Sequence, residues 1–351
     1  MQSEKVNNSS LIFTCDPDEA LEELLSSLSF DKVLVVSDTK VHSTCKHLVP
    51  VLVPFPFSII KEGERNKTLD SLKEVWEEMY RNGLSRNSLL INFGGGVVTD
   101  LGGFAAATYM RGIRYINIPT TLLASIDASY GGKTAIDFCG VKNLIGSFHA
   151  PVSTIVSSKF LSTLPREEML SGYGEMLKHA LLNNREDVEF LLDNGLFSLS
   201  DADMLSLIKR SVNVKKSIVD SDPGEKGLRR ALNLGHTAGH ALEALMLGKG
   251  ESISHGHAVA LGILAELKLS PDFPSELLQR LADHILSLYP PVKIIREDLP
   301  LLKNLMSRDK KNRSCSHEMV SYIRLHCPGE FEIFSEAYAD ELTDALAEFC
   351  I

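Results

Sequence analysis

The chain has 351 residues, of which 44% are hydrophobic and 23% charged, a globular composition that excludes a small disulfide scaffold and a largely disordered chain. Its formal charge of -10 argues against nucleic acid as a partner. The six cysteines form no Cys-x-x-Cys pair, and the first residues contain no apolar signal-peptide core. We therefore expect a soluble cytoplasmic protein with no membrane span, large enough for two domains.

The first half of the sequence alternates short apolar runs with amphipathic segments. The segment Thr68–Asn82 has the period of a helix. The predicted strands are Ser10–Cys15, Lys32–Ser37, Val51–Pro54, Ser88–Phe93 and Tyr115–Ile118. Strands that alternate with helices favour right-handed crossovers, so this half predicts an α/β domain with a Rossmann-like parallel sheet.

From about Pro165 the hydrophobic period becomes helical, and only Val320–Leu325 resembles a strand. The predicted helices are Arg166–Asn183, Ala202–Val219, Arg230–Leu247, Ala258–Leu269, Ser275–Leu288 and Glu336–Phe349. We predict two domains, residues 1–157 and a mainly helical domain of residues 158–351. Clefts between domains are common ligand sites.

Asn92–Asp100 contains three consecutive glycines, Gly94 to Gly96, between an apolar strand and an apolar helix. Glycines at a helix N-terminus let the backbone approach a pyrophosphate, although Thr99 replaces the third glycine of the strict dinucleotide fingerprint. A simple tight turn is the alternative. Thr120 and Thr121 follow the next strand and add hydroxyls at the same sheet edge, which favours a nucleotide site.

Glycine-rich chain continues through Asp127, Lys133, Lys142 and Asn143, and we expect it to be irregular. Its lysines are either ordinary solvated side chains or, given their glycine neighbours, anion ligands. Basic residues at Lys215, Arg229, Arg230, Lys310 and Lys311 are likewise either helix surface or contacts to an anionic substrate.

His236 and His240 lie at i and i+4, so both are candidate metal ligands by spacing. A second pair, His255 and His257, precedes another predicted helix, and Glu175 lies one turn from Lys178. A single histidine is more often structural, but this clustering with acids favours a zinc or similar divalent site.

These residues resemble the 3-dehydroquinate synthase family in order and spacing, from about Glu62 to Lys311. The motifs that carry the resemblance are Gly94-Gly95-Gly96-x-x-x-Asp100, Pro119-Thr120-Thr121, Gly131-Gly132-Lys133-Thr134, Lys142-Asn143, Gly174-Glu175-x-x-Lys178, Asn233-x-Gly235-His236-Thr237-x-Gly239-His240 and His255-Gly256. The resemblance implies a cytoplasmic homodimer of the shikimate pathway that uses NAD and a divalent metal, zinc or cobalt. Its substrate is a phosphorylated sugar acid, 3-deoxy-D-arabino-heptulosonate 7-phosphate. Transient oxidation by NAD, phosphate elimination, re-reduction and aldol cyclisation give 3-dehydroquinate.

The resemblance also implies a role for each matching residue. The metal ligands are Glu175, His236 and His255, which moves His240 from the metal to the substrate. The NAD site comprises Asp38, Glu64, Lys67, Gly94, Gly95, Gly96, Asp100, Thr120, Thr121 and Lys142. The substrate site comprises Asp127, Lys133, Lys142, Asn143, Lys178, Lys215, Arg229, Asn233, His240 and Lys310 or Lys311, with Arg111 from the partner of the dimer.

Four positions depart from the family pattern: His257 replaces a glutamate, Asp137 an asparagine, and Ser157 and Lys159 acids. None of them is a metal ligand or substrate lysine. We expect His257 to be a solvated residue or a neighbour of the ligands. The alternatives are another sugar phosphate cyclase, such as a 2-deoxy-scyllo-inosose or valiolone-type synthase, a metal-dependent alcohol or glycerol dehydrogenase, and an inactive NAD-binding protein.

Overall fold

The computed structural model describes residues 2–6, 9–128, 131–222, 224–308 and 318–351. Contacts group residues 1–165 with 200–212 into one compact unit, and residues 166–199 with 213–351 into another. No helix in the described ranges is long and apolar enough to cross a membrane.

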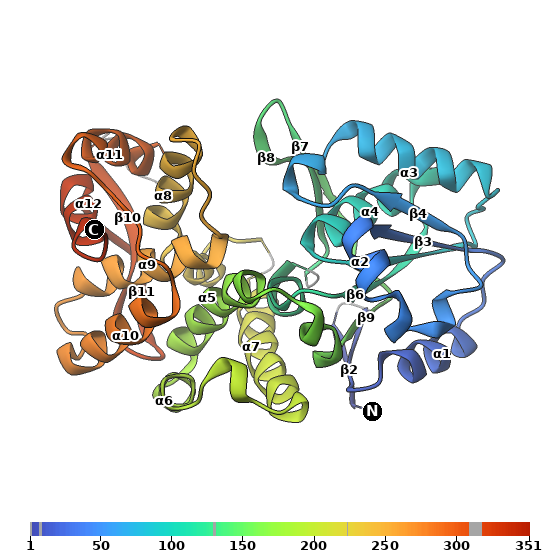
Figure 1. The fold of residues 1–351 in the computed structure, drawn as a ribbon, viewed down its shortest axis with the longest axis horizontal. Coiled ribbons are helices and arrows are strands. Elements are labelled where there is room, and N and C mark those ends of the chain that lie inside the picture. Colours follow the sequence, from blue (N-terminus) through green and yellow to red (C-terminus); the bar gives the residue numbers. More distant parts are fainter. Residues whose placement is uncertain (1, 7–8, 129–130, 223, 309–317) are drawn as a thin grey trace. The chain divides into compact units, whose positions relative to one another are not determined.

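The first unit is built on a seven-stranded sheet (Figure 1). Six of its strands are parallel, and β1 pairs antiparallel with β2 at one edge. In spatial order the strands are β1 (Gln2–Val6), β2 (Ser9–Phe13), β9 (Ser153–Val156), β6 (Arg114–Pro119), β5 (Leu89–Gly94), β3 (Val33–Asp38) and β4 (Phe57–Ile60). The predicted parallel sheet is therefore confirmed.

Both faces of this sheet are buried because its central strands are apolar at almost every position. Val35 and Ile91 point into a core that contains helix α1 (Pro17–Ser27) and the segment after α2 (Thr39–Thr44). Their neighbours Val36 and Leu90 point to the other face, against α3 (Leu69–Arg81) and α4 (Gly96–Thr108). Side chains alternate along a strand, so a continuous apolar run can cover two cores.

Helix α3 confirms the prediction for Thr68–Asn82. Thr68 caps it by accepting a hydrogen bond from the backbone N–H of Ser71, and Asn82 ends it. Leu72, Val75 and Met79 form its buried stripe.

Two predictions for this unit are wrong. Val51–Pro54 is not a strand, because Pro50 starts a 3-10 turn, Pro50–Leu52, whose Leu52 fills the core. The segment around Lys133 is not irregular but forms a hairpin of β7 (Lys133–Phe138) and β8 (Val141–Phe148). Its two-residue turn, Cys139-Gly140, has positive φ at both residues, as such tight hairpins require.

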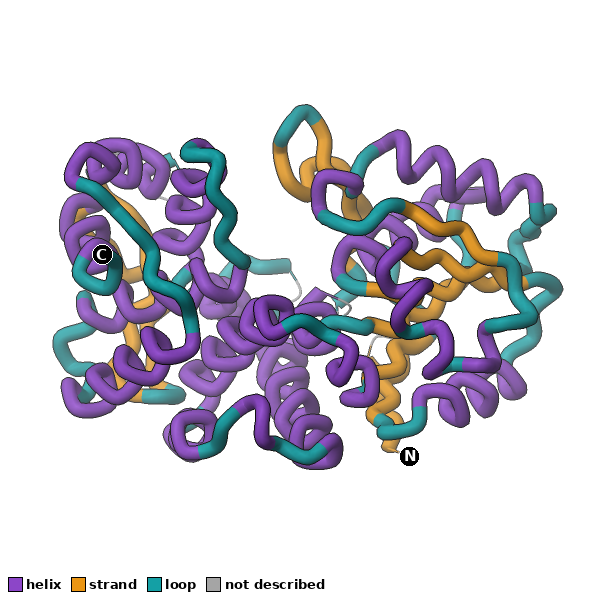
Figure 2. The backbone as a smooth tube through the Cα atoms, viewed as in Figure 1, coloured by secondary structure: helices purple, strands orange, loops and turns teal. Residues whose placement is uncertain are grey.

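The second unit is mainly helical (Figure 2). Its helices are α5 (Arg166–Asn183), α6 (Arg185–Asp193), the end of α7 (Asp201–Ser221), α8 (His236–Gly248), α9 (His255–Lys268), α10 (Ser275–Leu288), α11 (Leu299–Ser307) and α12 (Ala339–Ala347). A hairpin of β10 (Met319–Cys327) and β11 (Glu330–Tyr338) completes it. Predicted helices at 166–183 and 275–288 match α5 and α10.

Two predicted helices in this unit begin too early. Residues Glu336–Tyr338 end strand β11, so the last helix starts only at Ala339. The predicted helix Arg230–Leu247 is interrupted, because Leu228–Asn233 form a 3-10 helix, η8, and Gly235 has a left-handed backbone with φ 77°. Helix α8 therefore begins at His236.

Candidate metal and nucleotide sites

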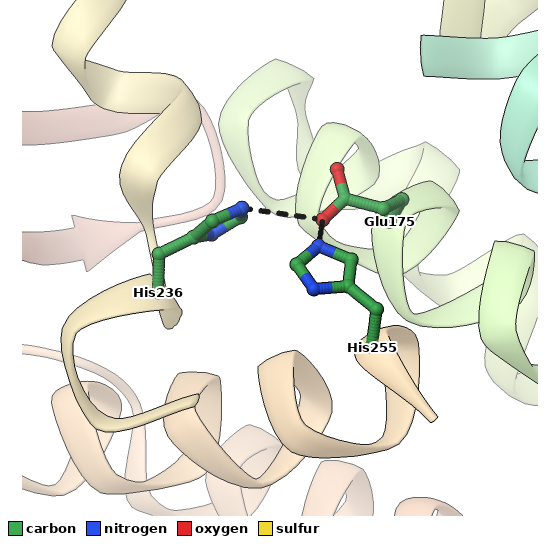
Figure 3. A group of neighbouring side chains, drawn as sticks. All are labelled: Glu175, His236 and His255. Carbon is green, nitrogen blue, oxygen red and sulfur yellow. Dashed lines mark ion pairs between the residues drawn. The ribbon is translucent and has the colours of Figure 1, made fainter. Parts of the chain in front are cut away.

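Glu175, His236 and His255 come from three different helices of the second unit and meet at one point (Figure 3). The Oε1 atom of Glu175 lies 3.5 Å from Nε2 of His236 and 3.4 Å from Nε2 of His255. Ligand atoms bound tetrahedrally to zinc at about 2.0–2.1 Å are about 3.3–3.4 Å apart, so both distances from the carboxylate to the imidazoles are close to those of a zinc site. One carboxylate and two imidazoles would also leave a position open for substrate.

Charges around these residues favour a cation at the same point. Burial alone would raise the pKa of Glu175, but Lys178 and the two histidines hold that pKa well below its ordinary value. Burial would lower the pKa of His255, but Glu175 and Glu243 raise it to about 9. The negative charge that raises the pKa of His255 and pairs with Lys178 would also attract a divalent cation.

Glycines next to the three ligands allow the helices to approach. A Cβ atom on Gly174 would collide with the backbone of Gly256, and one on Gly256 would collide with the backbone of Ser171. Gly235 also packs on the backbone of α9, where a Cβ atom would lie 2.6 Å from the carbonyl oxygen of Val259. Each metal candidate is thus adjacent in sequence to the residue that permits the contact.

The other nitrogen of each histidine ring also has a partner. Nδ1 of His236 lies 3.1 Å from the backbone carbonyl oxygen of Leu234, and Nδ1 of His255 lies 3.2 Å from Oε2 of Glu243. Sequence reasoning missed Glu243. The available signal was its position on α8, where His236, His240 and Glu243 follow each other at i, i+4 and i+7 and so share one helix face.

His240 lies beside this group but not in it. Its ring centroid is 5.2 Å from that of His236 and 6.1 Å from that of His255. It belongs to a second cluster, His240, Glu243 and His255, whose ligand atoms are also within 4.8 Å of one another. The substrate role implied for His240 stays a prediction.

Three of the basic residues predicted for the substrate are buried in the second unit. Lys178 is ion-paired with Oε2 of Glu175 in the interior of the unit, and Lys215 and Arg229 are both 7% exposed. Arg229 and Asn233 belong to η8, which packs against α5. Buried cations of this kind are strong anion ligands because little water competes with them.

A carboxylate holds the turn that carries Arg229. Asp222 accepts hydrogen bonds from the backbone N–H groups of Lys226, Gly227 and Arg229 at 3.0, 2.7 and 3.1 Å. Within the turn, Glu225 has a positive φ of 55°. Asn143 and Arg111 share this uncommon conformation, with φ of 53° and 72°, and such backbone strain is concentrated at functional sites.

The predicted nucleotide residues lie at the carboxyl edge of the sheet in the first unit. Gly94 ends β5 opposite Pro119 of β6, and the N–H of Thr120 donates to the Gly94 carbonyl at 3.0 Å. Helix α4 starts at Gly96 with no side-chain cap, and the buried Oγ1 of Thr120 has no hydrogen-bond partner among the described residues. Uncapped N–H groups and an unsatisfied hydroxyl fit a phosphate-bearing cofactor.

Other members of the predicted NAD set lie on the neighbouring strands of that edge. Asp38 ends β3 and accepts a hydrogen bond from the N–H of Val41, while burial raises its pKa. Glu64 and Lys67 follow β4, and Thr121 follows β6. Parallel strands bring their carboxyl ends together, which is why residues so distant in sequence share an edge.

Lys67 is a buried lysine that contacts both Asp100 and Asn143. It is 3% exposed, and its Nζ lies 2.6 Å from both Oδ2 of Asp100 and Oδ1 of Asn143. Burial would lower its pKa, but Asp100 and Glu64 raise it, so the ammonium stays charged. The structure thus joins residues predicted separately for NAD and for substrate.

The remaining predicted residues are more dispersed. Lys133 and Lys142 are exposed on the β7–β8 hairpin, and Asp127 lies in a short π-helical segment, Ala124–Ala128. Arg111 ends a 3-10 turn after α4. Lys310 and Lys311 lie outside the described residues.

The position of His257 corrects one expectation. It is not solvated but 5% exposed, and its ring stacks on Tyr289 with centroids 4.7 Å apart. Burial lowers its pKa to about 4, so it is neutral at pH 7. His257 takes no part in the three-residue metal group.

The remaining departures from the family pattern have local structural roles. Asp137 accepts a hydrogen bond from the backbone N–H of Asn143 at 2.8 Å. Ser157 caps the next 3-10 helix by accepting from the N–H of Lys159. Neither contact involves Glu175, His236 or His255.

Two family models match consecutive parts of the chain, the 3-dehydroquinate synthase N-terminal model over residues 57–171 and the C-terminal model over 172–312. The chain is 42% identical over 337 residues to the 3-dehydroquinate synthase of Parabacteroides distasonis, covering 94% of this chain and 95% of that protein. The chain belongs to the 3-dehydroquinate synthase family.

Solved structures of other cyclases share the fold of this 3-dehydroquinate synthase family member. A 2-deoxy-scyllo-inosose synthase complexed with carbaglucose-6-phosphate, NAD+ and Co2+ matches with a TM-score of 0.85 at 23% identity, over 99% of both chains. The 2-epi-5-epi-valiolone synthase from Streptomyces hygroscopicus, with NAD+ and Zn2+ bound, matches with a TM-score of 0.81 at 24% identity, over 99% of this chain and 98% of that one.

Proposed function

We propose that this protein is an active 3-dehydroquinate synthase, which converts 3-deoxy-D-arabino-heptulosonate 7-phosphate to 3-dehydroquinate and phosphate. The observation that carries the proposal is the convergence of Glu175, His236 and His255 in a chain of this family. An inactive relative would have no reason to keep a buried carboxylate and two imidazoles at the spacing of a metal site.

We assign the metal, zinc or cobalt, to Glu175, His236 and His255, and NAD to the edge formed by Gly94–Gly96, Thr120 and Thr121. When bound, the metal supplies Lewis-acid chemistry and NAD supplies reversible hydride transfer. The protein's own contribution is to hold the substrate. Lys178, Lys215 and Arg229 would bind its anionic groups, while Asn233 and His240 donate or accept hydrogen bonds.

The deciding assay follows phosphate release from the heptulosonate phosphate with trace NAD, while absorbance at the NADH band is recorded in the same cuvette. We expect many phosphates per NAD and no accumulation of NADH. One NADH per turnover would identify a dehydrogenase instead. Replacing Glu175, His236 or His255 with alanine should remove both bound metal and activity.

Another sugar phosphate cyclase is the second candidate, because two such enzymes share the fold. Buried Lys215 and Arg229 favour a substrate that carries a carboxylate in addition to its phosphate. Competing substrates decide the question: the sugar acid phosphate should be turned over, while glucose 6-phosphate and sedoheptulose 7-phosphate should release no phosphate.

We further infer a cytoplasmic homodimer, in which Arg111 reaches the partner's substrate. The described cysteines, Cys15, Cys45, Cys139, Cys327 and Cys350, are all free thiols, which suits a reducing compartment. Light scattering coupled to size-exclusion chromatography measures the mass directly. Mixing an Arg111→Ala protein with one that lacks a metal ligand should restore part of the activity if Arg111 acts across the dimer.

A further inference from the structure

Glu243 contacts the metal group from outside it. Its Oε2 lies 3.2 Å from Nδ1 of His255, on the opposite side of the ring from Nε2, which faces Glu175. The Glu243 side chain is partly buried, with 18% of its surface exposed, so the contact is partly shielded from water.

A neutral imidazole carries a single N–H proton, on either Nδ1 or Nε2. If Nδ1 carries the proton and donates it to a carboxylate, Nε2 is left with a lone pair, which is the form that binds a metal. The same hydrogen bond fixes the rotation of the ring. A negatively charged acceptor also makes Nε2 a better donor to a cation than a neutral acceptor would.

The two ligand histidines differ in how they are held. His236 donates to the backbone carbonyl of Leu234, only two residues away, so its orientation is set by the turn that precedes α8. His255 is the first residue of α9, and Ser254 caps that helix through the N–H of His257 rather than through His255. Its ring partner comes instead from α8, the neighbouring helix.

We propose that Glu243 is a positioning residue for the metal: it selects the tautomer and orientation of His255 and strengthens Nε2 as a ligand. This inference rests on the proposed metal site. The ion pair with Lys178 at Oε2 partly neutralises Glu175. Glu243 adds a second negative charge to the group, next to His255. A fourth side chain, Glu243, therefore supports the ligand set without touching the metal.

The test measures zinc affinity by competition with a chromophoric chelator and needs no turnover. Glu243→Ala should weaken zinc binding by about 10- to 100-fold, the usual effect of losing such a partner. Glu243→Gln keeps a carbonyl oxygen as acceptor but removes the charge, so its affinity should fall between those of the alanine variant and the wild type. The matched control is Glu251→Gln, an exposed acid just beyond α8, which should bind zinc like the wild type.

A cobalt-substituted sample adds a second readout. Because the ligand atoms are retained, the visible d–d bands of Glu243→Gln should keep the wild-type coordination pattern, while affinity falls. If Glu243→Ala fails to fold, Glu243→Gln alone decides, since it is nearly isosteric.

Three outcomes separate the possibilities. Wild-type zinc affinity in Glu243→Ala, or in a well-folded Glu243→Gln if the alanine variant does not fold, would overturn the positioning role. Loss as complete as in His255→Ala, with altered cobalt bands, would make Glu243 a ligand itself and also overturn it. Failure of the wild-type protein to bind zinc at all would instead refute the proposed metal site, so the two failures can be told apart.

Discussion

Lys67 and Asn143 are 76 residues apart, yet the lysine Nζ lies 2.6 Å from the asparagine Oδ1. The same ammonium is ion-paired with Asp100 at the start of α4. A single buried cation thus ties the β7–β8 hairpin to the helix that follows the glycine triplet. Asn143, whose φ is positive, is held in place by this contact and by Asp137.

Lys67→Met should lower the free energy of unfolding by about 2 kcal/mol, because it leaves Asp100 and Asn143 without their shared donor. NAD affinity should fall as well. Urea titration and isothermal calorimetry with NAD measure the two effects. The control is Lys73→Met on α3, whose side chain is 70% exposed, and it should change stability by less than about 0.5 kcal/mol. Equal effects of the two substitutions would contradict the role given to Lys67.

Asp222→Ala should release the turn that carries Arg229, since three backbone N–H groups lose their acceptor. We expect kcat/KM for the phosphorylated substrate to fall by roughly tenfold, mainly through KM, while zinc content stays the same. Asp220→Ala is the matched control, because Asp220 is exposed near the end of α7, two residues before Asp222, and forms an ion pair with Lys216 at 3.5 Å. If both variants keep wild-type KM, the turn does not depend on Asp222.

His257→Glu restores the residue usual in the family but places a carboxylate where a neutral ring stacks on Tyr289. The free energy of unfolding should fall by about 1–3 kcal/mol, as expected for a polar group buried without its partner. Bound metal should remain at wild-type stoichiometry. His257→Phe keeps the stacking and should be more stable than His257→Glu. Loss of metal in His257→Glu, measured by elemental analysis, would show that His257 supports the ligands.

His284 predicts a pH dependence of stability. Its Nε2 lies 2.7 Å from the hydroxyl of Tyr173, and burial lowers its pKa below the ordinary 6.5. Below pH 6.5 the unfolded chain therefore binds more protons at this residue than the folded one, and stability is lost as pH falls through that value. In His284→Gln this part of the loss should disappear. Urea midpoints from pH 7.5 to 5.0 give the difference; parallel curves for both proteins would rule the contribution out.

The period of apolar residues along the sequence is enough to predict some of the helices. Helices α5 and α10 match their predicted ranges because their apolar residues recur at the helical period. The apolar run Val51–Pro54 resembles a strand in sequence, but it does not reveal that Pro50 starts a turn. The hairpin beginning at Lys133 was missed because its turn depends on positive φ at Cys139, a residue that rarely adopts it.

Some residues of the candidate site can likewise be identified from the sequence, and others only from the packed structure. The resemblance to the family names Glu175, His236 and His255 as the metal ligands, whereas spacing alone points to His236 and His240. Glu243 could not be identified in this way, because its contact to His255 joins two helices and becomes visible only when they are packed. The burial of His257 was equally hidden, as it depends on Tyr289 of a distant segment.

The glycines beside the three metal candidates have a consequence for how an ion enters. Contacts of Gly174, Gly235 and Gly256 bring main chain against main chain, so the backbone positions from which the three side chains extend are held by helix packing. Such a site is preorganised, and little conformational entropy remains to be lost when the ion arrives. Small zinc domains fold around their metal. In this protein the helices also pack through their own main-chain contacts, so removal of zinc should leave the helical content unchanged.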